Sequence, residues 1–279
     1  MTNAIPESIM PFSGCREICI IAIGNFAMKS ILFKDIGLMP YEAAWGFQEV
    51  LMRGNLEIKS EWYRSGSPVK PTELHTKDYL LFCEHPHVYT LGKSGHMENL
   101  LVNDTRLAEM GATFVKTNRG GDITYHGPGQ VVGYPILDLE HFETDLGKYM
   151  RNLEEVIIRT LAIHGISAGR LPGSTGVWLD PDIKGRARKI CAMGVRCSRW
   201  VTMHGFALNV NTDLNYFNYI VPCGITDKAV TSLKKELGRE VDIESIKQEL
   251  KCNFADVFGA ELRETQSILP DVVTASISP

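Results

Sequence analysis

Apolar residues recur at intervals of three and four in two long stretches, the spacing that places side chains on one face of an α-helix. The first stretch follows Pro40, which suits a first helical position, and predicts an amphipathic helix that ends at about Lys59. The second begins at Leu146 and predicts a helix that ends near Gly165, because glycine readily adopts the backbone of a C-cap. The pattern in residues 230–258 predicts two more helices.

Runs of apolar and β-branched residues predict strands between these helices. The expected strands cover residues 31–36, 78–91, 113–116 and 131–137, and strand-like patterns dominate residues 176–211. Pro86 lies inside the second run and cannot donate a ladder hydrogen bond, so we expect a bulge or a break into two strands there. No repeat or linker divides the chain. The fold class predicted is therefore α/β, a single domain around a mixed sheet.

The two ends of the chain differ in pattern from the rest. Residues 1–27 cluster Ser, Pro and Gly before a short apolar stretch, and we interpret them as an N-terminal extension of unclear role. The alternative is that translation begins at Met28, which N-terminal sequencing would exclude if it read Thr-Asn-Ala. Residues 28–262 are expected to form the folded domain and residues 263–279 a loosely held tail.

Composition and charge limit the classes of function. The 279 residues include 29 basic and 33 acidic side chains, a net charge of −4, which does not favour nucleic acid as the main partner. The seven cysteines are an odd number without paired C-x-x-C spacing, as expected of reduced thiols in a cytoplasmic protein. The longest apolar run, residues 18–27, is interrupted and falls short of the roughly 20 residues of a membrane span, so no membrane partner is expected.

Residues 119–130 (RGGDITYHGPGQ) form the densest glycine-rich and polar segment, between two predicted strands. Glycine has no side chain and tolerates unusual dihedral angles, so the backbone here can approach a ligand closely. An ordinary turn is the alternative, because such dipeptides mainly mark turns. The segment matches neither the phosphate-binding loop nor the dinucleotide-binding glycine motif, and it gives no support to nucleotide binding.

A cysteine and a lysine are the candidates for covalent chemistry. Cys223 lies between proline and glycine and can present its sulfur from a loop, although cysteine is often only a small buried residue. Lys189 enters an apolar strand after a basic run, although a lysine there is often a solvated edge charge. A lysine beside a cysteine favours the nucleophilic thiolate, and a desolvated lysine can act as a base.

Histidines offer weaker candidates. His126 and His204 each precede a glycine and could assist proton transfer, but a hydrogen-bonded structural role is commoner for a lone histidine. His85 and His87 are two residues apart and could share a strand face. A zinc site needs three or four ligands, and no third ligand of matching context is present, so no metal is predicted.

Five of these stretches together resemble one family, the lipoyl(octanoyl) transferases. The matching stretches, in the order of the family, are residues 84–92 (EHPHVYTLG), 119–130 (RGGDITYHGPGQ), 189–194 (KICAMG), 204–211 (HGFALNVN) and 222–224 (PCG). A single short match would be weak, but five ordered matches over residues 31–258 are highly specific. Residues 1–27 have no counterpart in this resemblance.

The resemblance implies a fold similar to that of biotin and lipoate protein ligases, with residues 28–262 as the catalytic domain. It assigns Cys223 as the acyl-accepting thiol and Lys189 as the residue that activates it and handles protons. The positions that match the acyl-substrate-binding segments are Arg119, Gly120, Gly121, Asp122, Ile123, Thr124, Tyr125, His126, Ala192, Met193, Gly194, Gly205, Phe206 and Ala207.

These roles imply a two-step transfer in protein lipoylation. Cys223 would take an octanoyl group from octanoyl-acyl carrier protein, and the ε-amine of a lysine on an apo lipoyl domain would then receive it as an amide. A thioester is already activated, so neither a cofactor nor a metal is expected. Backbone N–H groups near His126 or Cys223 are candidate oxyanion donors. Neutral Lys189 is the preferred base for the amine, with His126 as the alternative.

Three other readings stay open from the sequence. An ATP-dependent lipoate or biotin ligase would need a nucleotide site and no cysteine nucleophile. An inert carrier-binding or lipoyl-domain-binding module would need neither Lys189 nor Cys223. A cysteine hydrolase would release free octanoate. A further hypothesis is that a basic surface steers an acidic carrier protein, formed by Arg186, Arg188, Lys189, Arg196 and Arg199.

Overall fold

The computed structural model describes residues 29–66, 68–221 and 229–266, in which strands and helices alternate. The helices are α1 (Tyr41–Ser65), α2 (Asp104–Glu109), α3 (Leu146–Ile163), α4 (Leu233–Leu237) and α5 (Ile243–Phe258), with 3-10 segments η1 (Pro71–Glu73), η2 (Met97–Asn99), η3 (Leu139–His141) and η4 (Leu214–Tyr219). The strands are β1 (Lys29–Leu38), β2 (Asp78–Glu84), β3 (Val88–Leu91), β4 (Thr113–Lys116), β5 (Ile123–His126), β6 (Gln130–Ile136), β7 (Gly169–Leu171), β8 (Ser174–Leu179), β9 (Arg188–Ser198), β10 (Val201–Asn209), β11 (Ala229–Val230) and β12 (Ala260–Glu264).

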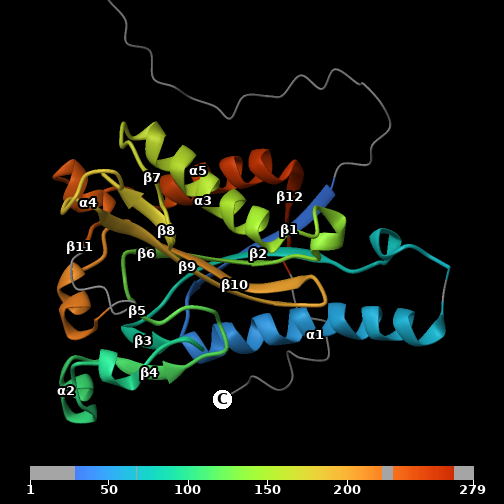
Figure 1. The fold of residues 1–279 in the computed structure, drawn as a ribbon, viewed down its shortest axis with the longest axis horizontal. Coiled ribbons are helices and arrows are strands. Elements are labelled where there is room, and N and C mark those ends of the chain that lie inside the picture. Colours follow the sequence, from blue (N-terminus) through green and yellow to red (C-terminus); the bar gives the residue numbers. More distant parts are fainter. Residues whose placement is uncertain (1–28, 67, 222–228, 267–279) are drawn as a thin grey trace, which may run out of the picture.

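Two sheets organise the described part of the chain (Figure 1). The larger sheet has nine strands in the order β12-β1-β2-β6-β10-β9-β8-β7, with β11 beside β9. Its β1 pairs in parallel with both β12 and β2, whereas β2, β6, β10, β9 and β8 pair antiparallel in turn. A smaller sheet has the order β4-β3-β5. This mixed α/β architecture confirms the predicted fold class.

Both faces of the large sheet are covered, which explains the continuous apolar runs in its central strands. Helices α3 and α5 cover one face, and α1 lies against the other (Figure 1). In β2, Leu80 and Phe82 belong to the core under α3 and α5, whereas Leu81 and Cys83 belong to the core under α1. The alternation follows from the two-residue period of a strand. No helix in the described ranges is long and apolar enough to span a membrane.

The observed boundaries refine several predictions. Pro40 has an extended backbone and is the N-cap, so α1 starts one residue later than expected and continues past Lys59 to Ser65. The proline-containing run does break into two strands, which belong to different sheets. Val230, expected in a helix, lies in β11, where it pairs with β9.

The predicted start of the loosely held tail, at residue 263, falls inside a strand. β12 extends to Glu264 and pairs in parallel with β1, and residue 263 is partnered with Leu32. The strand is short and half polar because it lies at the edge of the sheet, so its sequence shows no clear apolar alternation. Residues 267–279 and the whole of the proposed N-terminal extension lie outside the described residues, and those assignments stay predictions.

Candidate active site

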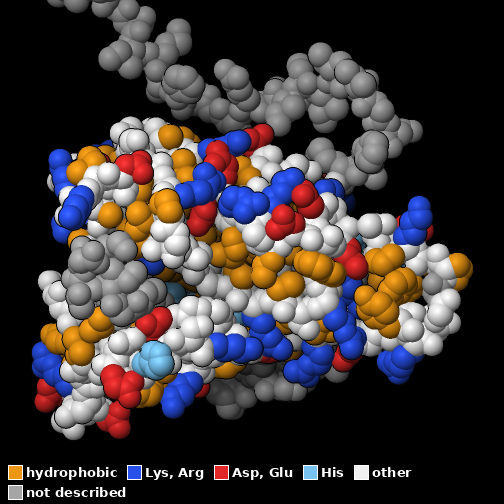
Figure 2. Space-filling view, in the orientation of Figure 1, with side chains coloured by type: hydrophobic (Ala, Val, Ile, Leu, Met, Phe, Trp, Pro, Cys, Tyr) orange, Lys and Arg blue, Asp and Glu red, His pale blue; other side chains and the backbone are white. Residues whose placement is uncertain are grey.

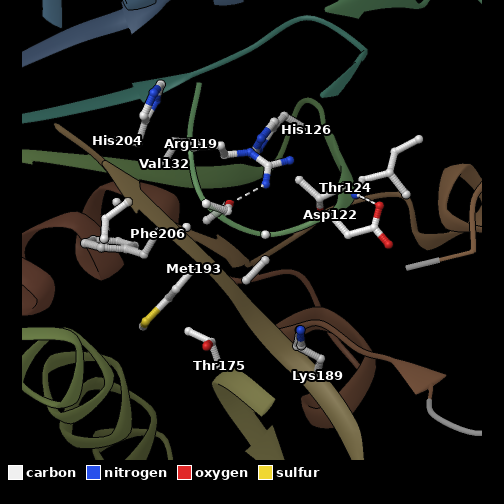
Figure 3. A pocket seen from close by; sticks show the side chains of 18 of the residues that line it. Arg119, Asp122, Thr124, His126, Val132, Thr175, Lys189, Met193, His204 and Phe206 are labelled. Atoms are coloured by element: carbon white, nitrogen blue, oxygen red, sulfur yellow. Dashed lines mark hydrogen bonds between the residues drawn. The ribbon is translucent and has the colours of Figure 1, made fainter. Parts of the chain in front are cut away.

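A cavity of about 500 Å³ lies where the segment before β5 crosses the large sheet. Its walls come from β5 and the loop before it, from β6, β9 and β10, and from the turn between β7 and β8 (Figure 3). This volume is within the range of small-molecule sites. Segments far apart in the sequence therefore meet around one space.

Four small residues form the floor of this cavity. Ala192 on β9 is opposite Ala207 on β10, and Gly194 is opposite Gly205, so two cross-strand pairs on the same face of the sheet present almost no side chain. The N–H of Gly120 donates to the carbonyl of β9 residue 195 at 2.9 Å, which holds the crossing loop against the strand. A Cβ on Gly194 would lie only 2.7 Å from the carbonyl oxygen of Gly120, so glycine is needed for this close crossing.

Arg119 ties the crossing loop to the small sheet. Its side chain is largely buried, and one terminal nitrogen donates to both the backbone oxygen and the hydroxyl of Thr90, at 2.7 and 2.9 Å. The other terminal nitrogen donates to the carbonyl of Gly120 at 3.0 Å. Hydrogen bonds from a charged donor are stronger than neutral ones, so this guanidinium holds the loop firmly in place.

Lys189 lies near the start of β9, as predicted, and its side chain reaches into the cavity (Figure 3). Its Nζ is 4.6 Å from the ring centroid of Trp178, the residue directly opposite on β8. On the other side Lys189 pairs with Val230 of β11. A β-bulge in β8 and the absence of a side chain at Gly176 leave room for the lysine stem.

Cys223, the predicted nucleophile, lies outside the described residues, but the described residues on either side of that gap have defined partners. Val221 precedes Cys223 by two positions, and its N–H donates to the carbonyl of Asn99 at 2.8 Å. Val230, on the other side of the gap, lines the cavity and pairs with Lys189.

His126 is held by hydrogen bonds on both ring nitrogens. The Nε2 of Gln130 donates to Asn209, which identifies the other amide atom of Gln130 as the oxygen. This Oε1 accepts a hydrogen bond from Nδ1 of His126 at 2.7 Å. The Nε2 of His126 then accepts from the hydroxyl of Thr90 at 3.3 Å. Burial lowers the pKa of His126 well below its ordinary value, with His85 and Arg119 adding to the effect. His126 is therefore neutral with its lone pair occupied, which favours the structural role over proton transfer.

His204 is also buried, on an unusual backbone with φ of 60°. Asn118 donates through Nδ2 to Glu49 at 2.9 Å, so its Oδ1 faces His204 and accepts from Nε2 at 2.7 Å. The proton of the neutral ring is thus on Nε2, and Nδ1 has no hydrogen-bond partner within the described protein. Burial, followed by Arg119 and Arg196, lowers the pKa of His204 to about 3.

His85 and His87 make hydrogen bonds to different residues. His85 donates from Nδ1 to the carbonyl of Met39 and accepts from Tyr134, and burial lowers its pKa to about 4. His87 contacts the hydroxyl of Tyr125 at 2.7 Å. Within the described ranges no group of three or more His, Cys, Asp or Glu side chains could hold a metal ion.

The structure brings nearly all the predicted binding residues to the cavity wall, and Tyr125 is the exception. Thr124 and His126 face the cavity, whereas the ring of Tyr125 points to the other side of β5 and stacks on Tyr216 at 4.9 Å. The two-residue strand period is the cause. We therefore correct the assignment of Tyr125: it supports the small sheet and does not line the site.

Several lining residues were not predicted from the sequence. They lie outside the five matched stretches, on elements that the fold brings to the cavity: Tyr41, Val132, Tyr134, Met150, Gly173, Ser174, Thr175, Phe217 and Val230. Most of them are apolar, which ordinary core packing explains equally well, and the sequence contains no signal that separates them from other core residues.

The basic residues of the steering hypothesis do not form one surface. Arg188 begins β9 and Arg199 follows its end, which places them roughly 35 Å apart along the strand. Arg188 is paired with Asp180 and Glu236, and Arg196 with Glu49. Figure 2 shows acidic and basic side chains interspersed over the visible face. These residues of the described chain therefore do not form the single basic patch that the hypothesis expected.

Comparison with known proteins agrees with this site and fold. The family model of the lipoyl protein ligase A/B catalytic domain matches residues 40–255. The octanoyltransferase of Christiangramia forsetii is 55% identical over 236 residues, which cover 84% of this chain and 98% of that protein. The octanoyltransferase of Flavobacterium johnsoniae is 56% identical over 235 residues, 84% of this chain and 99% of that protein.

Solved structures show the same fold at low sequence identity. A bi-partite lipoate protein ligase of Thermoplasma acidophilum superposes with a TM-score of 0.60 at 17% identity, covering 85% of this chain and 87% of that chain. A lipoate-protein ligase A bound with ATP gives a TM-score of 0.57 at 18% identity, with 85% and 89% covered. The predicted similarity to lipoate protein ligases is confirmed.

The fold, the cavity and the family model together define a class: the chain belongs to the lipoyl protein ligase A/B family of catalytic domains. Within that family, its identity of more than half with full-length relatives makes it a member of the octanoyltransferases, which are acyltransferases. The family resemblance deduced from the five motifs is confirmed.

Proposed function

We propose that this enzyme transfers an octanoyl group from octanoyl-acyl carrier protein to the ε-amine of a lysine on an apo lipoyl domain, through a thioester on Cys223. The observation that carries the proposal is the cavity of about 500 Å³, which has a floor of alanine and glycine and Lys189 in its wall. Both described residues that border the Cys223 segment, Val221 and Ala229, are attached to residues at or next to this cavity.

In the first step the Cys223 sulfur bonds to the carbonyl carbon of the octanoyl thioester. The bond from that carbon to the carrier's phosphopantetheine sulfur breaks, and the octanoyl group remains on the enzyme. Neutral Lys189 takes the proton from the Cys223 thiol and gives it to the leaving phosphopantetheine sulfur, so this step has no net uptake or release of protons.

In the second step the lysine amine of the lipoyl domain attacks the same carbon. A carbon–nitrogen bond forms and the bond to the Cys223 sulfur breaks. Lys189 takes a proton from the amine and passes it to that sulfur, which restores the thiol. Because the acceptor lysine enters as an ammonium ion, one further proton goes to water, and no oxidant or nucleotide is consumed.

The lining supports binding of an eight-carbon chain. Val132, Met150, Met193 and Phe206 give the cavity apolar surface, which favours an aliphatic ligand. Backbone N–H groups of residues 119–126 are the proposed oxyanion donors, since fixed dipoles stabilise developing charge without reorganisation. The proposed partners are acyl carrier protein and lipoyl domains, with no cofactor, metal, nucleic acid or membrane, in the cytoplasm.

A mass measurement tests the proposal. The purified protein and Cys223→Ala are incubated with octanoyl-acyl carrier protein, without ATP or acceptor. We expect one octanoyl group on the wild type alone, removable by hydroxylamine and transferred to an apo lipoyl domain on its addition. No adduct on the wild type, together with amide formation from octanoate and ATP, would replace the proposal with a ligase. Release of free octanoate without amide would replace it with a hydrolase.

A further inference from the structure

Asp122 is the only acidic side chain among the described residues that line the cavity. It belongs to a stretch matched to acyl binding, yet a carboxylate has no favourable contact to offer an aliphatic chain, and burial against one is costly. Figure 3 shows Asp122 and Lys189 at one end of the cavity, while Phe206 and Met193 lie at the other. The acidic group is therefore at the same end of the cavity as Lys189.

The carboxylate of Asp122 is held in a fixed orientation. Its Oδ1 accepts from the N–H of Ile123 at 2.6 Å, and its Oδ2 accepts from Nδ2 of Asn99 at 2.7 Å. A Cβ on Gly95 would lie 2.6 Å from Oδ1, so the glycine leaves the space that the carboxylate occupies. These contacts position the group before any substrate arrives.

The negative charge of Asp122 is not neutralised within the described protein. No lysine or arginine of the described ranges lies within ion-pair distance of it. Of the arginines near the cavity, Arg119 donates to Thr90 and Arg196 pairs with Glu49. A carboxylate offers about four acceptor positions and the two hydrogen bonds use two of them. The remaining positions can accept hydrogen bonds from a cation.

Asn99 connects this carboxylate to the segment that contains the proposed nucleophile. The Asn99 side chain donates to Asp122, and its backbone carbonyl accepts from Val221 at 2.8 Å. Val221 is two positions before Cys223 in the sequence. The carboxylate is thus linked through a single residue to the start of that segment.

We propose that Asp122 binds the ε-ammonium group of the acceptor lysine and directs it to the thioester. The inference rests on the proposed function, because that reaction brings a primary ammonium to this end of the cavity. A charge-assisted hydrogen bond from the ammonium to the oriented carboxylate places the nitrogen beside Lys189. Loss of one proton to water leaves the neutral amine, whose lone pair attacks the thioester carbon, and Lys189 takes the second proton as the carbon–nitrogen bond forms.

The variant Asp122→Asn removes the charge and can keep the local hydrogen bonds. The new amide oxygen can still accept from Ile123, and rotation of the Asn99 amide by 180° lets its oxygen accept from the new NH₂ group. Glu98→Gln is the matched control, since Glu98 is an exposed neighbour of Asn99 that does not line the cavity.

The test separates the two half-reactions. Wild type, Asp122→Asn and Glu98→Gln are loaded with octanoyl-acyl carrier protein, and loading is followed by intact mass. Each acyl-enzyme is then chased with an apo lipoyl domain over a range of concentrations, or with hydroxylamine, which carries no charge at neutral pH. For Asp122→Asn we expect loading within about twofold of wild type and a half-saturating lipoyl-domain concentration raised about tenfold or more. Its hydroxylamine chase should be unchanged.

Two results would overturn the inference while leaving the proposed function intact. One is an unchanged lipoyl-domain chase in Asp122→Asn. The other is an equal slowing of the lipoyl-domain and hydroxylamine chases, which would mean that the residue only maintains the shape of the site. Failure of the wild type to become acylated would instead overturn the proposed function, and this inference with it.

Discussion

At the scale of single residues, His204 combines a strained backbone with a defined tautomer. Its φ of 60° is in the left-handed region, where a Cβ costs roughly 1–2 kcal/mol. The backbone N–H donates to Gln48 at 2.8 Å and the ring donates to Asn118, so contacts with α1 and with the loop before β5 offset the strain. Through its backbone and its ring, this one residue connects β10 with α1 and with the loop before β5.

Two substitutions of His204 distinguish the effect of backbone strain on stability from the effect of the hydrogen bond of the ring. His204→Gly and His204→Ala both remove the ring, but only alanine retains a Cβ at positive φ. We expect the glycine variant to be the more stable by about 1 kcal/mol, with both less stable than wild type. Urea unfolding measures this difference, and an alanine variant at least as stable as the glycine variant would contradict the strain.

The buried histidines also predict a pH dependence of stability. The pKa of His204 in the fold, about 3, lies below its unfolded value of about 6.5, and that of His85 falls to about 4. The unfolded chain therefore binds more protons between these values, and the free energy of unfolding falls as pH drops from about 6.5 towards 3. Urea titrations at several pH values test this. The slope should become shallower in His204→Asn, and an unchanged slope would exclude His204 as a contributor.

At the scale of elements, the crossing of the 119–121 segment over β9 depends on glycine. A Cβ at Gly194 would meet the carbonyl of Gly120 at 2.7 Å, so Gly194→Ala must displace the crossing segment. We expect acyl-enzyme formation to slow by about tenfold or more, because small displacements in a reacting site have large effects on rate. The measurement is the rate of octanoyl loading by intact mass.

A matched control for Gly194→Ala is Gly54→Ala. Gly54 lies in α1, and a Cβ there would have no heavy atom within 4 Å. Loading should be unchanged and the free energy of unfolding should rise by about 0.4–1 kcal/mol, since alanine favours the helix. Equal loading rates in the two variants would show that the close crossing is not needed for acylation.

Helix α1 is attached to the rest of the protein by a buried ion pair. Nζ of Lys59 is 2.6 Å from Asp138 and 2.7 Å from Glu140, and the lysine side chain is fully buried. Lys59→Met leaves two carboxylates without their cation, and we expect a loss of about 3–5 kcal/mol in the free energy of unfolding.

An exposed pair gives the comparison for Lys59. Lys148→Met removes the partner of Glu143, where both side chains are about half exposed, and should cost less than about 1 kcal/mol. Urea unfolding of both variants measures the difference. Similar losses in the two would mean that burial of the Lys59 cluster does not determine its contribution.

At the scale of the whole molecule, the cavity is the space left where two sheets meet. An octanoyl group that fills the cavity buries apolar surface, and each buried methylene stabilises the folded protein by at most about 0.8 kcal/mol. We expect the octanoylated enzyme to have a Tm several degrees above that of the unmodified protein. Acetylation from acetyl-acyl carrier protein is the control and should raise Tm far less. Equal shifts would indicate that the acyl chain does not occupy the cavity.

The elements of this fold could largely be predicted from the chain alone. The period of apolar residues placed α1, α3 and the central strands, because periodicity depends on local geometry. It missed β12 and placed Val230 in a helix, since short edge strands lack a clear apolar period. The break at Pro86 was expected, but only the pairing shows that its two strands belong to different sheets.

For the site, the sequence by itself determined which residue types are present and, through five ordered motifs, the family to which the chain belongs. The tertiary structure decided which side chains face the cavity, turned Tyr125 away, and separated Arg188 from Arg196 along one strand. It also brought Asp122 to Asn99 and the flank of the Cys223 segment. The chemical type of a side chain is a property of the residue itself. Its orientation and its distance from other side chains are set only when segments far apart in the sequence pack together.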